Sequence, residues 1–492
     1  MIVSDSSEIT NANIIKAADI LDKVFGYKEF RPLQKETILS ILEGRDTLTV
    51  IPTGGGKSLC YQIPALMSRG LTLVISPLIS LMQDQVSQLL NAGISADFLN
   101  STLEPKEYLK VSERVRCGKT KLLYVAPESL CTKRFRNILE AGPEVSFITV
   151  DEAHCISEWG HDFRPDYLEI AAFRKQFPSA PCLALTATAT KQVQHDIIKL
   201  LAMENPEVLT ASFNRPNIYL DVKRKENAFF QITEFIEKHK NESGIIYCFS
   251  RKKVNELTEK LRAKGINALS YHAGLTDLQR AKNQRAFITD KADVMVATLA
   301  FGMGINKSNV RYVIHADLPK SLEQYYQETG RSGRDGLPSH ALLLYTPADT
   351  RKIRWLLEES NASVNSEKLL RGMVNFCETK SCRRKVLLEY FGEPYMNGES
   401  TCCCDNCRIF PEAKVPDTDE EYVRIERELR LWRRHLADEL NIPPYVIFGD
   451  KTLFSIAKEK PETENALRRC YGIGQAKLEK FGRSILRIVQ NG

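Results

Sequence analysis

Short apolar runs alternate with amphipathic stretches of helical periodicity over about the first 345 residues of this 492-residue chain. Apolar runs bounded by turn-forming residues are typical of buried strands, and their alternation with helical stretches is typical of a parallel sheet. The clearest runs are residues 47–51, 71–75, 121–125, 147–150 and 182–185, and then 244–249, 293–297 and 312–314. We therefore expect an α/β fold with two parallel-sheet domains, at residues 1–210 and 211–345.

The pattern changes after Tyr345, where the apolar runs stop. Residues 346–410 have a charged, helical character, and six cysteines lie between Cys377 and Cys407. A short linker then leads to residues 417–492, for which we expect a small all-α unit. Its first helix places one apolar stripe on Ile425, Leu429, Trp432, Leu436 and Leu440. We interpret the arginine-rich run 430–434 as a solvated helix face, and we expect Asp450 to cap the following helix.

The composition is that of an ordinary globular protein, with 43% apolar and 26% charged residues. A net charge of +6 permits a polyanionic partner such as nucleic acid. The polar N-terminus and the lack of a membrane-length apolar stretch predict an intracellular protein with no membrane partner. In a reducing compartment, clustered cysteines indicate a metal site before a disulfide.

The first predicted strand runs into a glycine-rich turn and then a helix, with the sequence Thr53-Gly54-Gly55-Gly56-Lys57-Ser58. Glycines let backbone N–H groups close around a phosphate, and the helix N-terminus adds a favourable dipole. Lys57 can reach the β- and γ-phosphates, and Ser58 can ligate Mg²⁺. The strict P-loop pattern has glycine where Ile51 stands, so this loop is a variant.

A second motif follows the strand at residues 147–150, where the chain continues with Asp151 and Glu152. Asp151 can hold Mg²⁺, and Glu152 can polarise the attacking water. Together with the glycine-rich turn, this pair predicts a site that binds and hydrolyses a nucleoside triphosphate, with ATP and Mg²⁺ as the expected cofactors. Either motif alone is also compatible with a simple turn or a charged strand end.

The second α/β domain has no P-loop of its own, but Arg331 and Arg334 lie in a glycine-containing segment, residues 327–336. Arginine can pair with phosphate oxygens in a bidentate way. An arginine contributed by this domain would stabilise the transition state and would tie hydrolysis to domain closure. The other interpretation is an exposed loop with surface arginines.

With these motifs, the chain resembles the RecQ family of superfamily 2 DNA helicases, from Phe25 to Cys407 and in a weaker form from about Arg424 to the end. The most specific block is Phe-Gly-Tyr-Lys-Glu-Phe-Arg-Pro-Leu-Gln at residues 25–34. The resemblance implies two tandem RecA-like domains, a helical zinc-binding module and a small HRDC-like bundle.

The same resemblance assigns roles around the nucleotide. It implies that Tyr27 stacks on adenine and that Arg31 and Gln34 hydrogen-bond its edge. It also implies that Arg334 is the principal arginine finger, with Arg331 beside it, and that a sensor segment at residues 184–189 couples the nucleotide to domain movement.

A polar loop just after the two carboxylates contains Trp159, Phe163 and Arg164. A lone tryptophan is more often a core residue, but aromatics beside an arginine can stack on unpaired bases, and the matching RecQ loop does so. Further segments that match family nucleic-acid contacts are residues 76–85, with Ser76 and Gln83, 126–130 and 298–304. Such contacts carry little base specificity.

The expected partner is DNA, single-stranded or in tailed and branched duplexes. By resemblance, a single-strand-binding protein or a topoisomerase is a further candidate partner, and the location is the cytoplasm or nucleoid if the protein is bacterial.

The cysteines at Cys382, Cys404 and Cys407 are typical of a four-cysteine structural zinc site. The family spacing places the remaining ligand at Thr401, which cannot serve. We therefore choose Cys402, with Cys403 as the alternative, and we take Cys377 as a core thiol. The other interpretation of the cluster is a redox-active dithiol.

One departure from the family separates two hypotheses. RecQ helicases usually carry a winged-helix domain between the zinc module and the HRDC module, whereas here residues 408–416 form the whole connection. We expect an ATP-dependent DNA helicase that translocates 3′ to 5′ and acts in recombination and repair. The alternative is a single-stranded DNA translocase that unwinds weakly. An RNA-directed helicase or a non-catalytic scaffold is disfavoured, and residues 469–482 suit either a nucleic-acid contact or a protein-docking turn.

Overall fold

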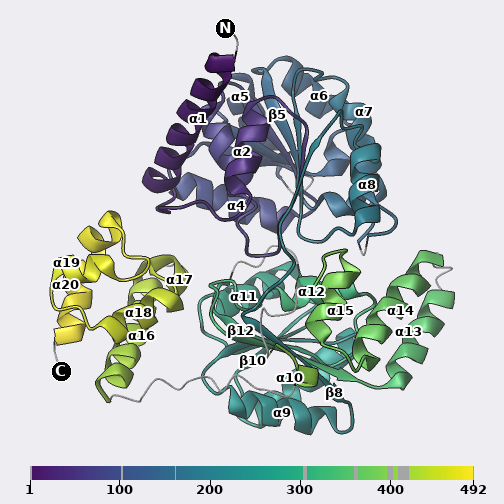
Figure 1. Ribbon diagram of the computed structural model, residues 1–492, viewed down its shortest axis with the longest axis vertical. Helices are drawn as coiled ribbons and strands as arrows, with labels where there is room; N and C mark the ends of the chain where they lie inside the picture. The colour runs from purple at the N-terminus through teal and green to yellow at the C-terminus, as the bar shows by residue number, and fades with distance from the viewer. Residues whose placement is uncertain are drawn as a thin grey trace. The chain divides into compact units, whose positions relative to one another are not determined.

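The computed structural model describes residues 3–100, 103–160, 162–302, 307–359, 364–395, 403–407, 420–440 and 442–490. The chain divides into two compact units (Figure 1). The first contains Met1–Phe213 and Tyr390–Glu393, and the second contains Asn214–Glu389 and Pro394–Gly492. Among the described residues, no helix combines the length and the apolar character needed to cross a membrane.

The first unit is built on a seven-stranded parallel sheet with the strand order β3-β4-β2-β5-β6-β1-β7. Its strands are β1 (Thr47–Val50), β2 (Leu71–Ile75), β3 (Ala96–Leu99), β4 (Leu122–Val125), β5 (Val145–Val150), β6 (Cys182–Thr186) and β7 (Glu207–Thr210). Its helices are α1 (Val3–Lys23), α2 (Gln34–Leu42), α3 (Leu59–Met67), α4 (Ile79–Asn91), α5 (Pro105–Arg116), α6 (Lys133–Glu140), α7 (Ile170–Arg174) and α8 (Lys191–Leu200). Each predicted apolar run of this domain coincides with a strand.

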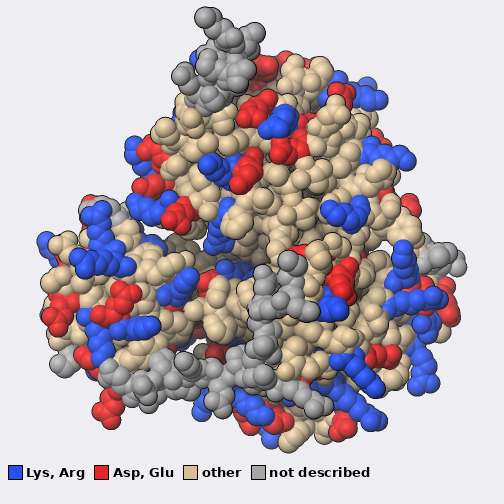
Figure 2. Space-filling model, viewed as in Figure 1, with Lys and Arg blue, Asp and Glu red and all other residues tan. Residues whose placement is uncertain are grey.

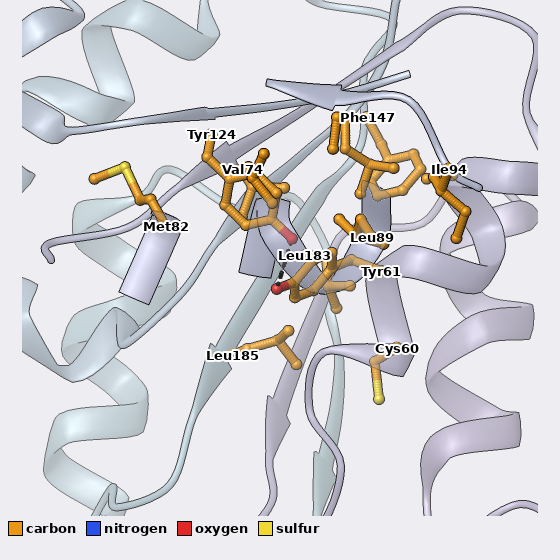
Figure 3. Packing of buried hydrophobic residues seen from close by; sticks show 14 of the residues in the cluster. Cys60, Tyr61, Val74, Met82, Leu89, Ile94, Tyr124, Phe147, Leu183 and Leu185 are labelled. Atoms are coloured by element: carbon orange, nitrogen blue, oxygen red, sulfur yellow. Dashed lines mark hydrogen bonds between the residues drawn. The ribbon is translucent and has the colours of Figure 1, made fainter. Parts of the chain in front are cut away.

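The core of the first unit lies where α3 and α4 cover the sheet (Figure 3). Met82 and Leu89 of α4 and Cys60 of α3 are buried against strand residues of β2, β4 and β6. Tyr61 and Tyr124 are also buried there, and the Tyr124 hydroxyl donates to the Tyr61 hydroxyl at 3.3 Å. Continuous apolar strands are therefore explained by a sheet that is covered by helices.

The second unit carries a six-stranded parallel sheet with the order β10-β11-β9-β12-β13-β8. Its strands are β8 (Ile218–Arg224), β9 (Ser243–Tyr247), β10 (Ala268–Tyr271), β11 (Val294–Ala297), β12 (Val310–His315) and β13 (Ser339–Tyr345). The helices between them are α9 (Ala228–Lys238), α10 (Arg251–Ala263), α11 (Asp277–Ile288) and α12 (Leu322–Thr329). The expected α/β fold with two RecA-like parallel-sheet domains is confirmed.

A helical region follows, as predicted, with α13 (Pro347–Glu359), α14 (Val364–Glu378) and α15 (Arg383–Tyr390). It is joined to the second sheet, because the backbone N–H of Leu220 in β8 donates to the Cys403 carbonyl at 3.1 Å. The Arg384 guanidinium also donates to the carbonyls of Arg215, at 2.7 Å, and Ile218, at 2.5 Å.

The last helices form a small all-α bundle, as expected: α16 (Glu420–Leu440), α17 (Pro444–Ile447), α18 (Asp450–Glu459), α19 (Glu464–Arg469) and α20 (Gln475–Gln490). Two local interpretations were wrong. Arg433 is buried and not on a solvated face, since it donates to Asp450 at 2.8 Å and to the Phe448 carbonyl at 2.9 Å. Asp450 therefore forms a buried ion pair, and Gly449 occupies the cap position of α18.

Candidate nucleotide, nucleic-acid and zinc sites

The glycine-rich loop connects β1 to α3, as predicted. Gly54 and Gly56 have φ values of 85° and 83°, a region that favours glycine. A Cβ on Gly55 would lie 2.2 Å from the Ile51 side chain, so this position also requires glycine. The Lys57 ammonium donates only to the Ile51 carbonyl, at 3.4 Å, among the hydrogen bonds of the described residues. Ser58 is half-buried at the start of α3. The loop is thus shaped to surround an anion.

Two of the residues expected to bind adenine form hydrogen bonds to the glycine-rich loop in this structure. Gln34 is 1% exposed, and its amide donates to the Gly56 carbonyl at 2.9 Å and accepts from the Arg31 backbone at 2.8 Å. The Arg31 guanidinium donates to the Gly54 carbonyl. Tyr27 is 52% exposed, so its ring is accessible for stacking. The base contacts stay predictions, and the structure adds that Arg31 and Gln34 fix the loop backbone.

The two carboxylates follow β5 and the glycine-rich loop follows β1. Because β5, β6 and β1 are neighbouring parallel strands, both lie at the carboxyl ends of the strands of this sheet. Burial and then the Glu152 charge raise the pKa of Asp151 to about 7, while Lys57 opposes the rise. Glu152 has φ of 47°, and its backbone N–H donates to the Asp151 carboxylate at 3.0 Å. A half-buried carboxylate pair close to a lysine is suited to a divalent cation, which would relieve the repulsion between the carboxylates.

His154 links these carboxylates to the sensor segment. Its Nδ1 lies 3.4 Å from the Glu152 carboxylate and 2.8 Å from the Thr186 hydroxyl. The backbone N–H of Thr188 donates to that same hydroxyl at 3.3 Å. The sequence analysis missed this role of His154, although the spacing Asp-Glu-Ala-His was visible. The chain of contacts gives the predicted sensor segment 184–189 a physical route to Glu152.

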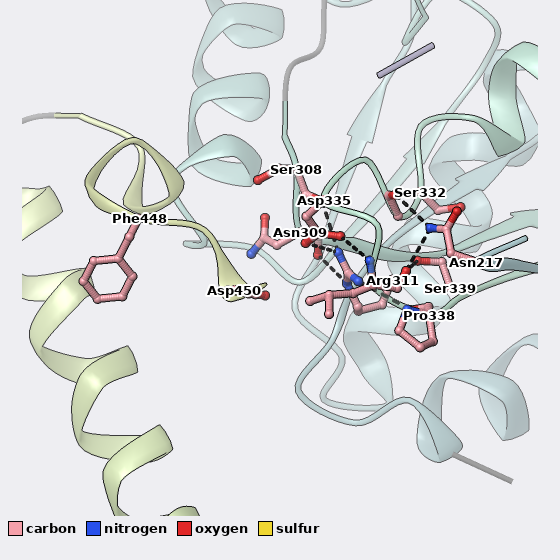
Figure 4. A network of polar contacts seen from close by, with 12 residues as sticks. Asn217, Ser308, Asn309, Arg311, Ser332, Asp335, Pro338, Ser339, Phe448 and Asp450 are labelled. Carbon is pink, nitrogen blue, oxygen red and sulfur yellow. Dashed lines mark hydrogen bonds and ion pairs between the residues drawn. The ribbon is translucent and has the colours of Figure 1, made fainter. Parts of the chain in front are cut away.

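The arginine segment of the second unit is anchored on its own sheet (Figure 4). Asn217 donates to the carbonyls of Gly333 and Leu337 at 2.9 Å, and Arg311 donates to the Asp335 carboxylate at 2.6 Å. A Cβ on Gly333 would lie 2.3 Å from the Asn217 amide, so the loop requires glycine there.

Neither predicted finger arginine is exposed, contrary to the interpretation as an exposed loop, since Arg331 is buried and Arg334 is half-buried. Arg331 is 6% exposed. Burial, and then the nearby charges of Arg331 and Arg215, lower the pKa of Arg334 to about 9. An arginine held among like charges gains from any anion that approaches it, which suits the predicted phosphate partner.

The aromatic loop after the carboxylates is half-buried at Trp159, Phe163 and Arg164. The Arg164 guanidinium donates to the Pro77 carbonyl at 3.0 Å and to Asp162 at 3.1–3.2 Å, so the loop contacts the segment that begins at Ser76.

Within that segment, Gln83 is exposed, whereas Ser76 is 1% exposed. The Ser76 side chain is therefore inaccessible, and Ser76 can contact a strand only through its backbone, whereas the Gln83 side chain is accessible at the surface. Of the third expected contact segment, 298–304, the last two residues lie outside the described residues.

Four cysteines gather beside β8, with sulfur atoms within 4.8 Å of one another: Cys382, Cys403, Cys404 and Cys407. The Cys382–Cys403 and Cys404–Cys407 sulfur atoms are 3.3 and 3.4 Å apart. Tetrahedral zinc with Zn–S bonds of about 2.3 Å needs sulfur atoms about 3.8 Å apart, so the set fits zinc with modest opening.

Cys403, the alternative ligand, therefore lies in the cluster, whereas Cys402, the first choice, lies outside the described residues. Cys377 is buried at 6% exposure, as expected of a core thiol.

Four protein families match consecutive parts of the chain. They are the DEAD/DEAH box helicase domain at residues 31–196, the helicase conserved C-terminal domain at 226–336, the RecQ zinc-binding domain at 347–408 and the HRDC domain at 424–489. The last two matches are separated by residues 409–423, a length that is too short for a further domain of ordinary size.

Curated relatives match over almost the whole chain. The ATP-dependent DNA helicase RecQ of Pasteurella multocida is 38% identical, over 96% of this chain and 93% of the relative. The protein of the same name from Bacillus subtilis is 35% identical, over 96% and 98%.

Among solved structures, the DEAD-box helicase Mss116 bound to ssRNA is similar with a TM-score of 0.57 and 17% identity, over 77% of this chain and 90% of that one. The Mycobacterium smegmatis helicase Lhr bound to ssDNA gives a TM-score of 0.54 and 20% identity, over 66% and 47%. These two likenesses support the fold.

Proposed function

Because this chain belongs to the RecQ family of ATP-dependent DNA helicases, we propose that it translocates 3′ to 5′ on single-stranded DNA and acts in recombination and repair. The observation that carries the proposal is the contact chain from Glu152 through His154 to Thr186, at the same sheet edge as the glycine-rich loop. It connects the predicted water-activating carboxylate to a segment that can respond to domain movement.

We assign the roles at the nucleotide as follows. Lys57 and the backbone of residues 53–56 bind the phosphates, and Glu152 orients the attacking water. Ser58 and Asp151 would hold Mg²⁺, which when bound neutralises charge on the phosphates. Arg334, with Arg331 beside it, supplies positive charge to the transition state when the domains close. Tyr27 stacks on the base, and Arg31 and Gln34 position both the base and the loop.

We assign the nucleic-acid contacts to the side chains of Trp159, Phe163, Arg164 and Gln83, and at Ser76, whose side chain is buried, to the backbone. Half-buried aromatics beside an arginine suit unpaired bases. Because Arg164 bonds the Pro77 carbonyl, a strand on this loop would also affect the segment at Ser76.

The division that we propose is a first RecA-like domain at 1–210, a second at 211–345, a zinc module at 346–410 and an HRDC-like bundle at 417–492. A single-strand-binding protein or a topoisomerase is a candidate partner. Mixing this chain with each purified candidate and testing whether the two co-purify would test this.

The decisive experiment measures ATP hydrolysis and strand separation together on a duplex with a 3′ single-stranded tail. We expect single-stranded DNA to stimulate hydrolysis and the duplex to be unwound, with Glu152→Gln inactive in both assays. A duplex with a 5′ tail should be unwound poorly. If DNA stimulates hydrolysis but the duplex stays paired, the protein is the translocase of the alternative hypothesis, in keeping with the short connection at residues 409–423.

A further inference from the structure

One segment of the first unit carries a large excess of positive charge. Residues 105–136 contain nine lysines and arginines but only three acidic residues, an excess that equals the +6 of the whole chain. The segment comprises α5, β4 and α6, with the η1 turn (Pro127–Ser129) between the last two. Residues 251–285 and 468–490 of the second unit are also basic, and Figure 2 shows basic and acidic side chains interspersed over the face that it draws.

Most of these basic side chains are exposed and lack an acidic partner. In the described part of the chain, only Arg114 of this set forms an ion pair, with Asp97 at 3.2 Å. Seven others are exposed: Lys106, Lys110, Arg116, Lys119, Lys133, Arg134 and Arg136. We name these seven side chains the α5–α6 surface. Several other helices pair charges one turn apart, as in Lys238–Glu234 and Arg424–Glu428.

The two helices form one continuous surface because Arg134 of α6 lies over the Tyr108 ring of α5, with its guanidinium carbon 3.4 Å from the ring centroid. Lys106 and Lys110 lie one turn apart on α5, so they share a face. The surface offers charge without a stacking platform, because Tyr108 is covered by Arg134 and Phe135 is fully buried.

This chemistry separates two kinds of nucleic acid. Proteins that bind single strands combine basic grooves with exposed aromatics on which bases stack. Duplex DNA hides its bases and presents a dense, regular array of phosphates, which unpaired lysines and arginines neutralise with release of counterions. A basic surface whose one tyrosine ring, Tyr108, is half-buried beneath Arg134 matches the duplex.

The α5–α6 surface is also distinct from the nucleotide site. It lies beside β3 and β4 at one edge of the sheet, whereas the glycine-rich loop follows β1, with β2, β5 and β6 in between. None of its residues contributes to the roles assigned above. We propose that the α5–α6 surface binds the phosphate backbone of the duplex part of a tailed DNA substrate, an inference that rests on the proposed helicase function.

The test compares two triple variants of the full chain. The first, Lys106→Gln/Lys110→Gln/Lys133→Gln, neutralises the surface and leaves Arg134 in place over Tyr108. The second, Lys238→Gln/Lys240→Gln/Lys264→Gln, removes the same charge from exposed lysines of the second unit. Fluorescence anisotropy measures the dissociation constant for a 3′-tailed duplex and for the same single strand alone, between about 50 and 200 mM salt.

We expect the first variant to bind the tailed duplex about tenfold more weakly at low salt. The slope of its log–log salt dependence should be shallower by roughly 0.9 for each phosphate that the variant no longer neutralises. Its affinity for the single strand and its DNA-stimulated ATP hydrolysis should stay within about twofold of wild type. The control variant should match wild type on both DNAs.

Two results would overturn the inference: duplex affinity equal to that of the control variant, or an equal reduction of affinity for both DNAs, which would assign the surface to the single strand. Failure of the proposed function looks different, because the wild-type protein itself would then show no DNA-stimulated hydrolysis.

Discussion

The two parallel sheets have the same topology, yet only one carries a nucleotide-binding loop. Numbered within each unit in chain order, the strands run 3-4-2-5-6-1 in both sheets, with β7 added at the edge of the first. Strand β8 of the second sheet is thus equivalent to β1, and β12 is equivalent to β5. The positions that carry the glycine-rich loop and the carboxylates in the first domain can therefore be compared directly with those in the second.

The chain after β8 is short and charged where the chain after β1 is long and rich in glycine. Only Lys225, Glu226 and Asn227 separate β8 from α9. Lys225 bonds Asp317, two residues beyond β12, at 2.9 Å, and Asp349 at 3.1 Å. A lysine and an aspartate thus follow the strands equivalent to those that precede Lys57 and Asp151, but here they pair with each other.

This difference shows what a phosphate site requires beyond a favourable topology. In the first domain, the only hydrogen bond of the Lys57 ammonium among the described residues is a long one to the Ile51 carbonyl, at 3.4 Å, which keeps the charge available to an anion. In the second, the internal ion pair satisfies both charges. At this position the second domain has a stabilising ion pair, whereas the first domain has the expected nucleotide site.

The largest effect is expected from Arg334→Ala, which would show what the second domain contributes in place of a loop. Loss of an arginine finger lowers kcat by about a thousandfold or more. Nucleotide affinity should change little, because the glycine-rich loop is intact. Single-turnover ATP hydrolysis and binding of a fluorescent nucleotide separate the two quantities. Arg311→Ala, which only removes an anchor of the loop through Asp335, should retain more activity. Equal activities of the two variants would contradict the assignment of Arg334.

Lys57→Ala and Lys225→Met form the matched pair that tests the comparison directly. Removing a charge that stabilises the transferring phosphoryl group should lower kcat by about a hundred- to a thousandfold in Lys57→Ala. The Lys225→Met protein should hydrolyse ATP within about threefold of wild type at a temperature where it is folded, as circular dichroism would verify. A comparable loss of activity in both variants would mean that the second lysine is not a purely structural residue.

Several features of this comparison were accessible from the sequence, and others were not. The strand at 71–75, the glycine-rich turn and the Asp151–Glu152 pair follow from local periodicity and spacing, so they could be predicted. The bond from Gln34 to Gly56, the burial of Arg433 and the contact from His154 to Thr186 depend on residues distant in sequence. Local patterns carry no information on such pairs. The Lys225–Asp317 pair was missed for the same reason, since ordinary charged residues give no signal.

The two sheets also differ on the outer side of the equivalent strands β1 and β8. Strand β1 pairs there with β7, whereas β8 forms an isolated bridge there, from Leu220 to Cys404 of the zinc cluster. We expect Cys403→Ser to lose the bound zinc and to lower the melting temperature, because the segment that pairs with β8 is then no longer held in place. The matched Cys402→Ser should keep about one zinc per chain by metal analysis. Retention of zinc in Cys403→Ser with loss of zinc in Cys402→Ser would restore the first choice of ligand.

Lys225→Met should also destabilise the second domain. The side chains of Lys225, Asp317 and Asp349 are 15%, 11% and 15% exposed, so removing the lysine leaves two largely buried carboxylates with one cation, Lys253 beside Asp317. Such a change costs about 3 kcal/mol. Urea denaturation measures it, and Lys238→Met, which breaks an exposed pair with Glu234, should cost less than about 0.5 kcal/mol. Similar costs for the two variants would show that the buried pair stabilises little.

The smallest expected effect is the pH dependence of that pair. Burial raises the pKa of Asp317, but Lys225 and Lys253 outweigh it, and the net pKa lies below the ordinary value. A carboxyl group with a lowered folded-state pKa contributes stability above its ordinary pKa of about 3.9, and the contribution is lost as the pH falls further. Wild type should therefore melt higher than Asp317→Asn at pH 7, and the difference should shrink as the pH falls from about 5 to 3. In a Lys225→Met background the dependence should weaken, because one of the two cations that lower the pKa of Asp317 is absent. A difference that stays constant over this range would mean that Asp317 contributes through its hydrogen bond from the Phe249 backbone, at 2.9 Å, and not through its charge.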